Sequence, residues 1–243
     1  MLEIKNIYKT FNPGTINEKV ALNGLSLKLN EGDFVTVIGG NGAGKSTMLN
    51  AVAGVWPVDE GQIIIDGTDV TKLSEYKRAA YLGRVFQDPM TGTAATMGIE
   101  ENLALAKRRG KTRFLRSGIT KAEREEYKEL LKILNLGLED RLTSKVGLLS
   151  GGQRQALTLL MATLQKPKLL LLDEHTAALD PKTAAKVLDI TDRIVNRDHL
   201  TTLMITHNMK DAIAHGNRLI MMMNGKIILD IQGEEKKKLT VKQ

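Results

Sequence analysis

The 243-residue sequence contains no cysteine, only 4% aromatic residues and no long hydrophobic run. Without cysteine, the chain can form neither a disulfide framework nor a thiolate metal site. With so few aromatic side chains, we expect a largely aliphatic core. The longest purely aliphatic run, Leu169 to Leu172, has the length of a strand, whereas a membrane-spanning helix needs roughly 20 apolar residues. The amino terminus also lacks the apolar centre of a secretory signal, so we expect a cytoplasmic protein that reaches a membrane only through a partner.

Basic residues outnumber acidic ones, and the formal net charge is +7. Much of the excess lies between Lys107 and Lys128, a segment with nine basic and three acidic residues. Such a run favours a solvated surface. Attraction to nucleotide, to nucleic acid or to an anionic membrane leaflet are the alternatives, and charge alone does not choose among them.

Strand and helix patterns alternate along most of the chain. The first thirty residues predict strands and turns, Phe34 to Ile38 predicts a buried strand, and a helix should run from about Lys45 to Gly54. From about residue 89 to 149 helical patterns interrupt the alternation, and Thr120 and Glu123 are spaced as a capping box. We therefore expect an α/β fold with a mostly parallel sheet, an N-terminal antiparallel β-subdomain and an inserted helical subdomain. The last residues, from Gly233 to Gln243, are expected to form a frayed tail.

A glycine-rich loop follows the strand at residues 34–38 and opens the next helix. Residues 39–46, GGNGAGKS, fit the phosphate-loop pattern G-x-x-x-x-G-K-[ST] at every fixed position. The glycines let backbone N–H groups converge on phosphate oxygens, and the helix N-terminus adds positive potential. Lys45 should reach the β- and γ-phosphates, and Ser46 should bind Mg²⁺. The expected nucleotide-binding residues here are Gly39, Asn41, Gly42, Ala43, Gly44, Lys45, Ser46 and Thr47.

Two carboxylates follow the apolar strand at residues 169–172. Such a strand in an open α/β sheet leaves its last residues at the edge where ligands bind. Asp173 can hold Mg²⁺ through water, and Glu174 can act as general base toward the attacking water. A strand that simply ends in solvent is the alternative, and the phosphate loop on the same chain argues against it.

A third segment, LSGGQ, places Ser150 and Gln153 at capping-box spacing. That spacing explains a helix start but not Gly151 and Gly152, because glycine in a helix costs on the order of 1 kcal/mol relative to alanine. A γ-phosphate that approaches the bare N–H groups would be a reason for both glycines.

Together these segments resemble the ATP-binding cassette family: GGNGAGKST matches its phosphate loop, LSGGQ its signature and LLLLDEHTAALD its magnesium strand and D-loop. The resemblance covers essentially the whole chain, which implies a single P-loop NTPase domain with its core at 1–88 and 150–243 and its helical subdomain at 89–149. Gln87 then matches the residue that senses Mg²⁺, and His207 matches the switch histidine at the γ-phosphate. Asp180 matches the dimer-facing aspartate of the D-loop.

Phe11 matches the aromatic residue that stacks on adenine in this family, with Tyr8 as the alternative ring. Two positions depart from the family pattern. His175 stands where proline is common, and Asn208 follows the switch histidine where aspartate is usual. Neither removes a catalytic group. His175 could be a pH-sensitive neighbour of Glu174, but a tolerated loop substitution is the favoured interpretation.

The resemblance implies an ATPase that uses ATP and Mg²⁺ and closes head-to-tail, as a homodimer or with a second cassette. We expect it to drive integral membrane permease chains from the cytoplasmic face of the membrane. An uptake system for a small solute, with amino acids as one option, and an extracytoplasmic binding protein fit best. An export or lipoprotein-release motor, or a soluble cassette of iron–sulfur assembly or nucleic-acid maintenance, are the alternatives. We expect no direct contact with nucleic acid.

Overall fold

The computed structural model describes residues 1–110 and 118–239. The chain divides into two compact units. The first unit contains residues 1–83, 168–174 and those from 199 onward, and the second contains residues 84–167 and 175–198. The helical segment predicted at 89–149 lies inside the second unit. In the described ranges no helix combines the length and the apolarity that crossing a membrane requires.

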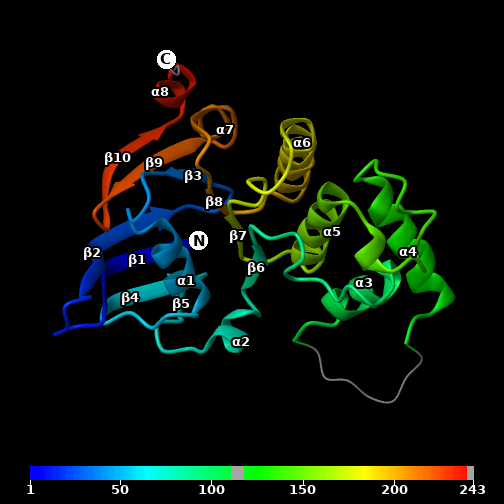
Figure 1. Ribbon diagram of the computed structural model, residues 1–243, viewed down its shortest axis with the longest axis horizontal. Helices are drawn as coiled ribbons and strands as arrows, with labels where there is room; N and C mark the ends of the chain where they lie inside the picture. Colours follow the sequence, from blue (N-terminus) through cyan, green and yellow to red (C-terminus); the bar gives the residue numbers. More distant parts are fainter. Residues whose placement is uncertain (111–117, 240–243) are drawn as a thin grey trace. The chain divides into compact units, whose positions relative to one another are not determined.

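An antiparallel sheet forms one part of the first unit (Figure 1). Its strand order is β2-β1-β4-β5, with β1 at Leu2–Phe11, β2 at Lys19–Leu29, β4 at Glu60–Ile65 and β5 at Thr68–Asp69. A tight turn at Asp66-Gly67 joins β4 to β5, and both residues have positive φ angles, 50° and 77°. The expected N-terminal antiparallel subdomain is therefore confirmed.

A six-stranded sheet carries the strands that bear the predicted chemistry. Its order is β10-β9-β3-β8-β7-β6. The bounds are β3 Phe34–Ile38, β6 Leu82–Val85, β7 Leu169–Asp173, β8 Thr202–Ile205, β9 Arg218–Met223 and β10 Lys226–Gln232. The pairs β3–β8, β3–β9 and β7–β8 are parallel, and β10 runs antiparallel to β9. Because β3, β7 and β8 are parallel neighbours, their carboxyl ends meet at one edge of the sheet.

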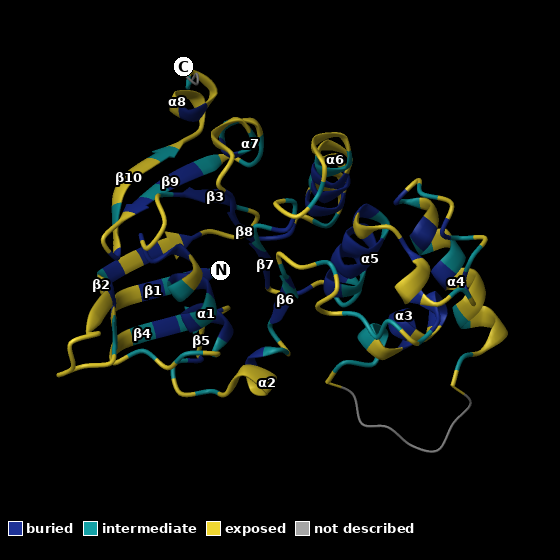
Figure 2. Cartoon of the chain, viewed as in Figure 1, coloured by how far each residue is buried: buried dark blue, intermediate teal, exposed yellow. Residues whose placement is uncertain are grey.

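The helices of the first unit are α1 (Lys45–Ala53), α2 (Glu75–Arg78), α7 (Met209–Ala214) and α8 (Glu234–Lys237). The core between the sheets and α1 is dominated by leucine, isoleucine and valine, as the shortage of aromatic residues predicts. Figure 2 shows β3 and β8 buried along their length. Arg78 is buried as well and donates to the carbonyl oxygens of Ala51 and Val52 at the end of α1. A cation at this position opposes the negative end of the helix dipole.

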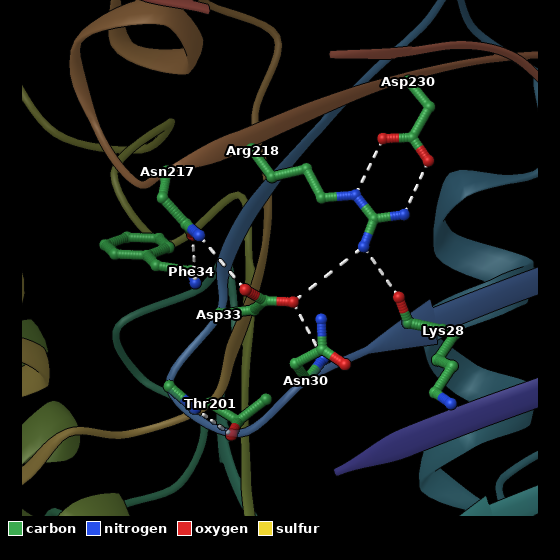
Figure 3. Close-up of polar contacts among 9 residues, drawn as sticks. Lys28, Asn30, Asp33, Phe34, Thr201, Asn217, Arg218 and Asp230 are labelled. Atoms are coloured by element: carbon green, nitrogen blue, oxygen red, sulfur yellow. Dashed lines mark hydrogen bonds and ion pairs between the residues drawn. The ribbon is translucent and has the colours of Figure 1, made fainter. Parts of the chain in front are cut away.

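Polar side chains join the amino ends of β3 and β9 to the carboxyl half of the antiparallel β10 (Figure 3). Arg218, the first residue of β9, forms a bidentate pair with Asp230 of β10, with Nε–Oδ1 and Nη2–Oδ2 distances of 2.7 and 2.6 Å. Asn217 donates to Asp33 at 3.1 Å and accepts from the backbone N–H of Phe34 at 2.7 Å. These contacts fix the register of β3, β9 and β10 at the edge opposite to the carboxyl ends.

The described part of the second unit is mainly helical, with α3 at Ile99–Lys107, α4 at Lys121–Lys132, α5 at Gly151–Thr163 and α6 at Pro181–Asp198. A single 3₁₀ turn, η1, spans Val146–Leu148. Thr120 caps α4 as predicted. Its hydroxyl accepts from the N–H of Glu123, and the Glu123 carboxylate accepts from the N–H of Thr120. The helical interpretation of this segment is confirmed.

The basic segment at 107–128 is partly neutralised where the structure describes it. Lys107 pairs with Glu126, Arg108 with Glu123 at 3.0 Å, and Arg124 with Glu100 at 2.6 Å. Residues 111–117 of this segment lie outside the described residues. The described pairs therefore fit a charged, self-compensating surface.

One prediction about the chain's last residues is wrong. We expected a frayed tail from Gly233 onward, but residues 234–237 form α8, and Lys236 is only 2% exposed. The charge of GEEKKK suggested a solvated tail, whereas the interior of the first unit offers backbone carbonyls to one of the three lysines. Residues 240–243 lie outside the described part.

Candidate nucleotide site

The phosphate-loop sequence forms a turn between the carboxyl end of β3 and the first residue of α1. Two of its glycines have backbone geometry and neighbours that exclude a side chain. At Gly39 (φ 151°) a Cβ would lie 2.4 Å from the Met222 carbonyl oxygen, and at Gly44 (φ 101°) it would lie 2.6 Å from that of Ala21. The glycines therefore permit both the left-handed turns and the close approach of the loop to its neighbouring strands.

Lys45 is folded back beneath this loop. Its Nζ donates to the carbonyl oxygens of Gly39 at 2.8 Å and Gly40 at 3.2 Å, and the residue is 5% exposed. Burial lowers the pKa of Lys45 below its ordinary value, while the charges of Glu174 and Asp173 oppose part of that shift. A buried ammonium that donates to neutral carbonyl groups is poised to exchange them for phosphate oxygens, which carry a full charge.

Glu174 and His207 meet where two parallel strands end. Asp173, the last residue of β7, is paired in register with Ile205 of β8, and the N–H of Glu174 donates to the Ile205 carbonyl at 3.1 Å. The His207 Nε2 and Glu174 Oε1 atoms are 2.5 Å apart. Glu174 has φ of 48°, an uncommon conformation for a residue with a side chain. Such backbone strain is frequent where a catalytic side chain must be aimed.

The phosphate loop, Glu174 and His207 line a single cavity of about 340 Å³. Its far end is aromatic: the Phe11 and Trp56 rings meet edge to face, with centroids 5.0 Å apart and an interplanar angle of 81°. An aromatic end and a loop of backbone N–H groups suit a base and a phosphate chain, respectively. Tyr8, the alternative to Phe11, is not among the lining residues; its hydroxyl lies against Gly24.

Two lining residues were not identified from the sequence. Trp56 is the only tryptophan of the chain and follows α1 closely. Lys19, the first residue of β2, extends over the phosphate loop, and a Cβ at Gly42 would lie 3.4 Å from its Nζ. Neither belongs to a sequence motif. The only available signals were the rarity of tryptophan and the basic residue at the start of β2.

The donors predicted for Mg²⁺ in this unit are oxygen atoms, as this ion requires. Ser46 lies in the first turn of α1 and lines the cavity, and Asp173 lies close enough to Lys45 to affect its pKa. In residues 1–110 and 118–239, no three His, Cys, Asp or Glu side chains gather into a metal site. The oxygen donors of Ser46 and Asp173 fit an ion held by one or two protein ligands, phosphate and water, which is the usual arrangement for Mg²⁺.

The signature segment lies in the second unit and forms the predicted cap of α5. The Ser150 hydroxyl accepts from the N–H of Gln153 at 3.3 Å, and the Gln153 side chain accepts from the N–H of Ser150 at 3.1 Å. Ser150, Gly152 and Gln153 line a hollow of about 490 Å³ with Thr183 and other residues of α6. Exposed Ser150 and Gly151 stand at the positive end of α5.

Packing explains one of the two signature glycines. Gly152 is buried, and a Cβ there would lie 2.1 Å from Cγ2 of Thr183 on α6. Gly151 is exposed, and its Cβ would meet only the end of the Leu179 side chain at 3.2 Å. The idea that a phosphate requires both glycines is therefore too broad, because helix packing alone excludes a side chain at Gly152.

Three more predicted positions belong to the second unit. Gln87 is exposed just after β6. Asp180 begins α6: its Oδ1 accepts from the N–H of Thr183 at 3.1 Å, and hydrogen bonds from Thr183 hold the pKa of Asp180 below its usual value. His175 is 1% exposed, with Nε2 3.1 Å from the Thr191 hydroxyl and its carbonyl accepting from Gln155. This burial supports a structural role for His175.

Comparison with known proteins agrees with this geometry. The family model described as ABC transporter matches residues 22–177. The tyrosine transport ATP-binding protein of Clostridioides difficile is 47% identical over 248 residues, covering 100% of this chain and 96% of that protein. The phosphonates import ATP-binding protein PhnC of Treponema denticola is 33% identical, covering 95% and 89%. The spermidine/putrescine import ATP-binding protein PotA of Haemophilus influenzae is also 33% identical, but the chain spans only 57% of its length.

Solved structures give the same result. A dimeric post-hydrolysis state of an ATP-binding cassette bound to ADP and Pi has a TM-score of 0.80 and 30% identity, covering 96% of this chain and 98% of that one. The ADP conformation of another ABC transporter cassette has a TM-score of 0.79 and 29% identity, covering 98% and 93%. The chain therefore belongs to the ABC transporter family. It is an ATP-binding subunit of this class and an ATP hydrolase with the P-loop fold.

Proposed function

We propose that the protein works as a head-to-tail dimer that closes around two Mg-ATP molecules. The main support for this proposal is the cavity of the first unit, which the phosphate loop, Glu174 and His207 line together. The signature segment offers a second phosphate-binding element, because Ser150 and the Gly151 N–H lie exposed at a helix N-terminus. In the closed dimer each ATP would lie between the phosphate loop of one subunit and the signature segment of the other. Asp180 would face the partner.

Hydrolysis follows from the contacts of three side chains. Lys45 exchanges its carbonyl partners for the β- and γ-phosphates and neutralises charge there. His207 is half-exposed and bound to Glu174, so it can turn from the carboxylate toward the γ-phosphate. Glu174 is then free to take a proton from the attacking water. Magnesium, with Ser46 and Asp173 as its proposed protein contacts in the first unit, would supply Lewis-acid polarisation of the phosphate oxygens.

We propose import of an aromatic amino acid as the transport role. The similarity to a tyrosine transport ATP-binding protein over essentially the full length of both chains supports this assignment. Import proteins for phosphonates and for spermidine/putrescine are more distant. The cassette would act at the cytoplasmic face of the membrane, bound to integral permease chains that receive substrate from an extracytoplasmic binding protein.

Replacement of Glu174 by glutamine tests the catalytic part. Glutamine keeps the size and hydrogen bonding but cannot accept the proton, so turnover should nearly vanish while ATP binding persists. Size-exclusion chromatography with ATP should then show an accumulated dimer. Lys45→Ala is the matched control, since it should lose nucleotide binding and remain monomeric. Wild-type hydrolysis by Glu174→Gln would contradict the assignment of the base.

The transport part needs the native complex. Affinity purification of the tagged chain from membranes should recover permease chains, and proteoliposomes containing that complex and its binding protein should take up labelled tyrosine in an ATP-dependent way. Spermidine serves as the comparison substrate. Uptake of spermidine without uptake of tyrosine would refute the substrate assignment and leave the ATPase assignment intact.

A further inference from the structure

A lysine from the C-terminal helix is buried against the end of α7, the helix that begins two residues after His207. Lys236 of α8 is 2% exposed, although its neighbours Lys237 and Lys238 are exposed. Its Nζ donates to the carbonyl oxygen of His215, to that of Gly216 at 3.0 Å and to the Thr36 hydroxyl at 3.4 Å. All three are oxygen acceptors, which suit an ammonium because it only donates hydrogen bonds.

The acceptors identify what Lys236 holds in place. His215 and Gly216 directly follow α7, so the ammonium lies at the negative end of that helix, where a cation is favourable. Thr36 lies in the middle of β3 and donates to the carbonyl oxygen of Ala212 within α7 at 2.9 Å. Lys236 and Thr36 together therefore fasten α7 to the strand that leads into the phosphate loop.

The other end of α7 begins beside His207. Asn208 is the N-cap of α7, and its side chain accepts from the N–H of Lys210 at 3.0 Å. The N–H of Asn208 donates to the Thr206 hydroxyl at 3.1 Å, and Thr206 is bonded to Val37 of β3 at 3.1 Å. His207 is thus held between β8 and α7, and its position depends on where α7 begins.

We propose that Lys236 is a positioning residue for ATP hydrolysis: by fixing α7 it sets the placement of His207. This inference rests on the proposed role of His207. A buried ammonium is a costly way to add stability alone, because an apolar side chain fills such a space without desolvating a charge. A cation is suited to holding backbone carbonyls at one place, which is what aiming a catalytic side chain requires.

The test compares Lys236→Met, which keeps the apolar stem and removes the charge, with Lys237→Met on the exposed face of α8. Lys236→Met should lower kcat by about tenfold and leave the KM for ATP within about twofold, because misplacement affects the transition state more than binding. Lys237→Met should match the wild type. Arg218→Met, at the amino edge of the sheet (Figure 3), controls for lost stability and should keep its kcat per folded molecule.

A double-mutant cycle shows whether the effect passes through His207. In a His207→Ala background, Lys236→Met should cause no further loss of kcat beyond about twofold. The same tenfold loss in both backgrounds, or a wild-type kcat for Lys236→Met, would overturn the inference alone. A fully active His207→Ala would overturn the role of His207 and the inference with it. If Lys236→Met does not fold, Thr36→Val removes the shared hydroxyl, and a wild-type kcat for that variant would overturn the proposal.

Discussion

Gly152→Ala separates two reasons for the bare backbone of the signature segment. The added Cβ would lie 2.1 Å from the Thr183 methyl carbon, so α5 and α6 must shift apart. Overpacking of this kind costs about 2–3 kcal/mol, and the better helix propensity of alanine returns about 1 kcal/mol. The net loss of about 1–2 kcal/mol should lower the melting temperature by about 3–6 °C in a chain of this size. Differential scanning calorimetry measures the shift.

The matched second variant is Gly152→Ala/Thr183→Ser. Serine keeps the hydroxyl that bonds Asp180 but removes the clashing methyl, and the next atom of Thr183, its Cβ, is 3.6 Å away. The double variant should therefore be more stable than Gly152→Ala. Gly151→Ala, whose Cβ meets only a flexible leucine end, should change the melting temperature little. A Gly152→Ala protein as stable as the wild type would refute the packing argument.

ATPase activity of the double variant adds a second result. If packing is the only reason for Gly152, turnover per folded molecule should return with stability. Restored stability without turnover would show that the nucleotide also needs a bare backbone at this position. Because packing leaves the exposed Gly151 unexplained, Gly151→Ala should reduce turnover while the melting temperature stays unchanged.

Three further changes test the nucleotide cavity of the first unit. Lys45→Ala should weaken ATP binding by about 2–3 kcal/mol, since a charge-assisted contact is lost. Titration with a fluorescent ATP analogue measures this, and unchanged affinity would show that the loop does not bind phosphate as argued. Lys19→Met should raise the Kd for ATP about fivefold, equivalent to about 1 kcal/mol, whereas Lys28→Met on the same strand should leave the Kd unchanged. Equal increases in both variants would show that the net charge of the protein, and not a contact of Lys19, affects binding. Trp56→Ala should raise the Kd about threefold to tenfold through loss of the aromatic end near Phe11, and an identical Kd in isothermal titration would exclude that end from base binding.

Local sequence signals predicted much of this fold. The phosphate loop and the caps at Thr120 and Ser150 each depend on residues a few positions apart, and each is found where expected. The periodicity of apolar residues in helices and strands also predicted the architecture of two sheets with helices. Short-range chemistry is sufficient for such features because their hydrogen bonds close within a single turn.

Features that depend on distant segments were missed. Trp56 and Lys19 reach one cavity only because β1 and β2 pair beside the end of α1. Lys236 is buried because α7 presents carbonyls to one lysine of three, and the composition of GEEKKK does not indicate which one. The packing reason for Gly152 lies 31 positions away, at Thr183. In each case the deciding neighbour is defined by tertiary contact.

The two ends of the parallel strands carry different kinds of contact. Arg218, Asp33 and Asn217 lie at or beside the beginnings of β9 and β3, where Arg218 also binds Asp230 of the antiparallel β10, while Glu174 and His207 follow the ends of β7 and β8. These two sets of residues do not overlap, so the Arg218–Asp230 pair can be replaced without removing a group that lines the nucleotide cavity. Stability and chemistry are therefore open to separate substitution in this fold, with the polar contacts at the amino ends of β3 and β9 varied and the residues at the carboxyl ends retained.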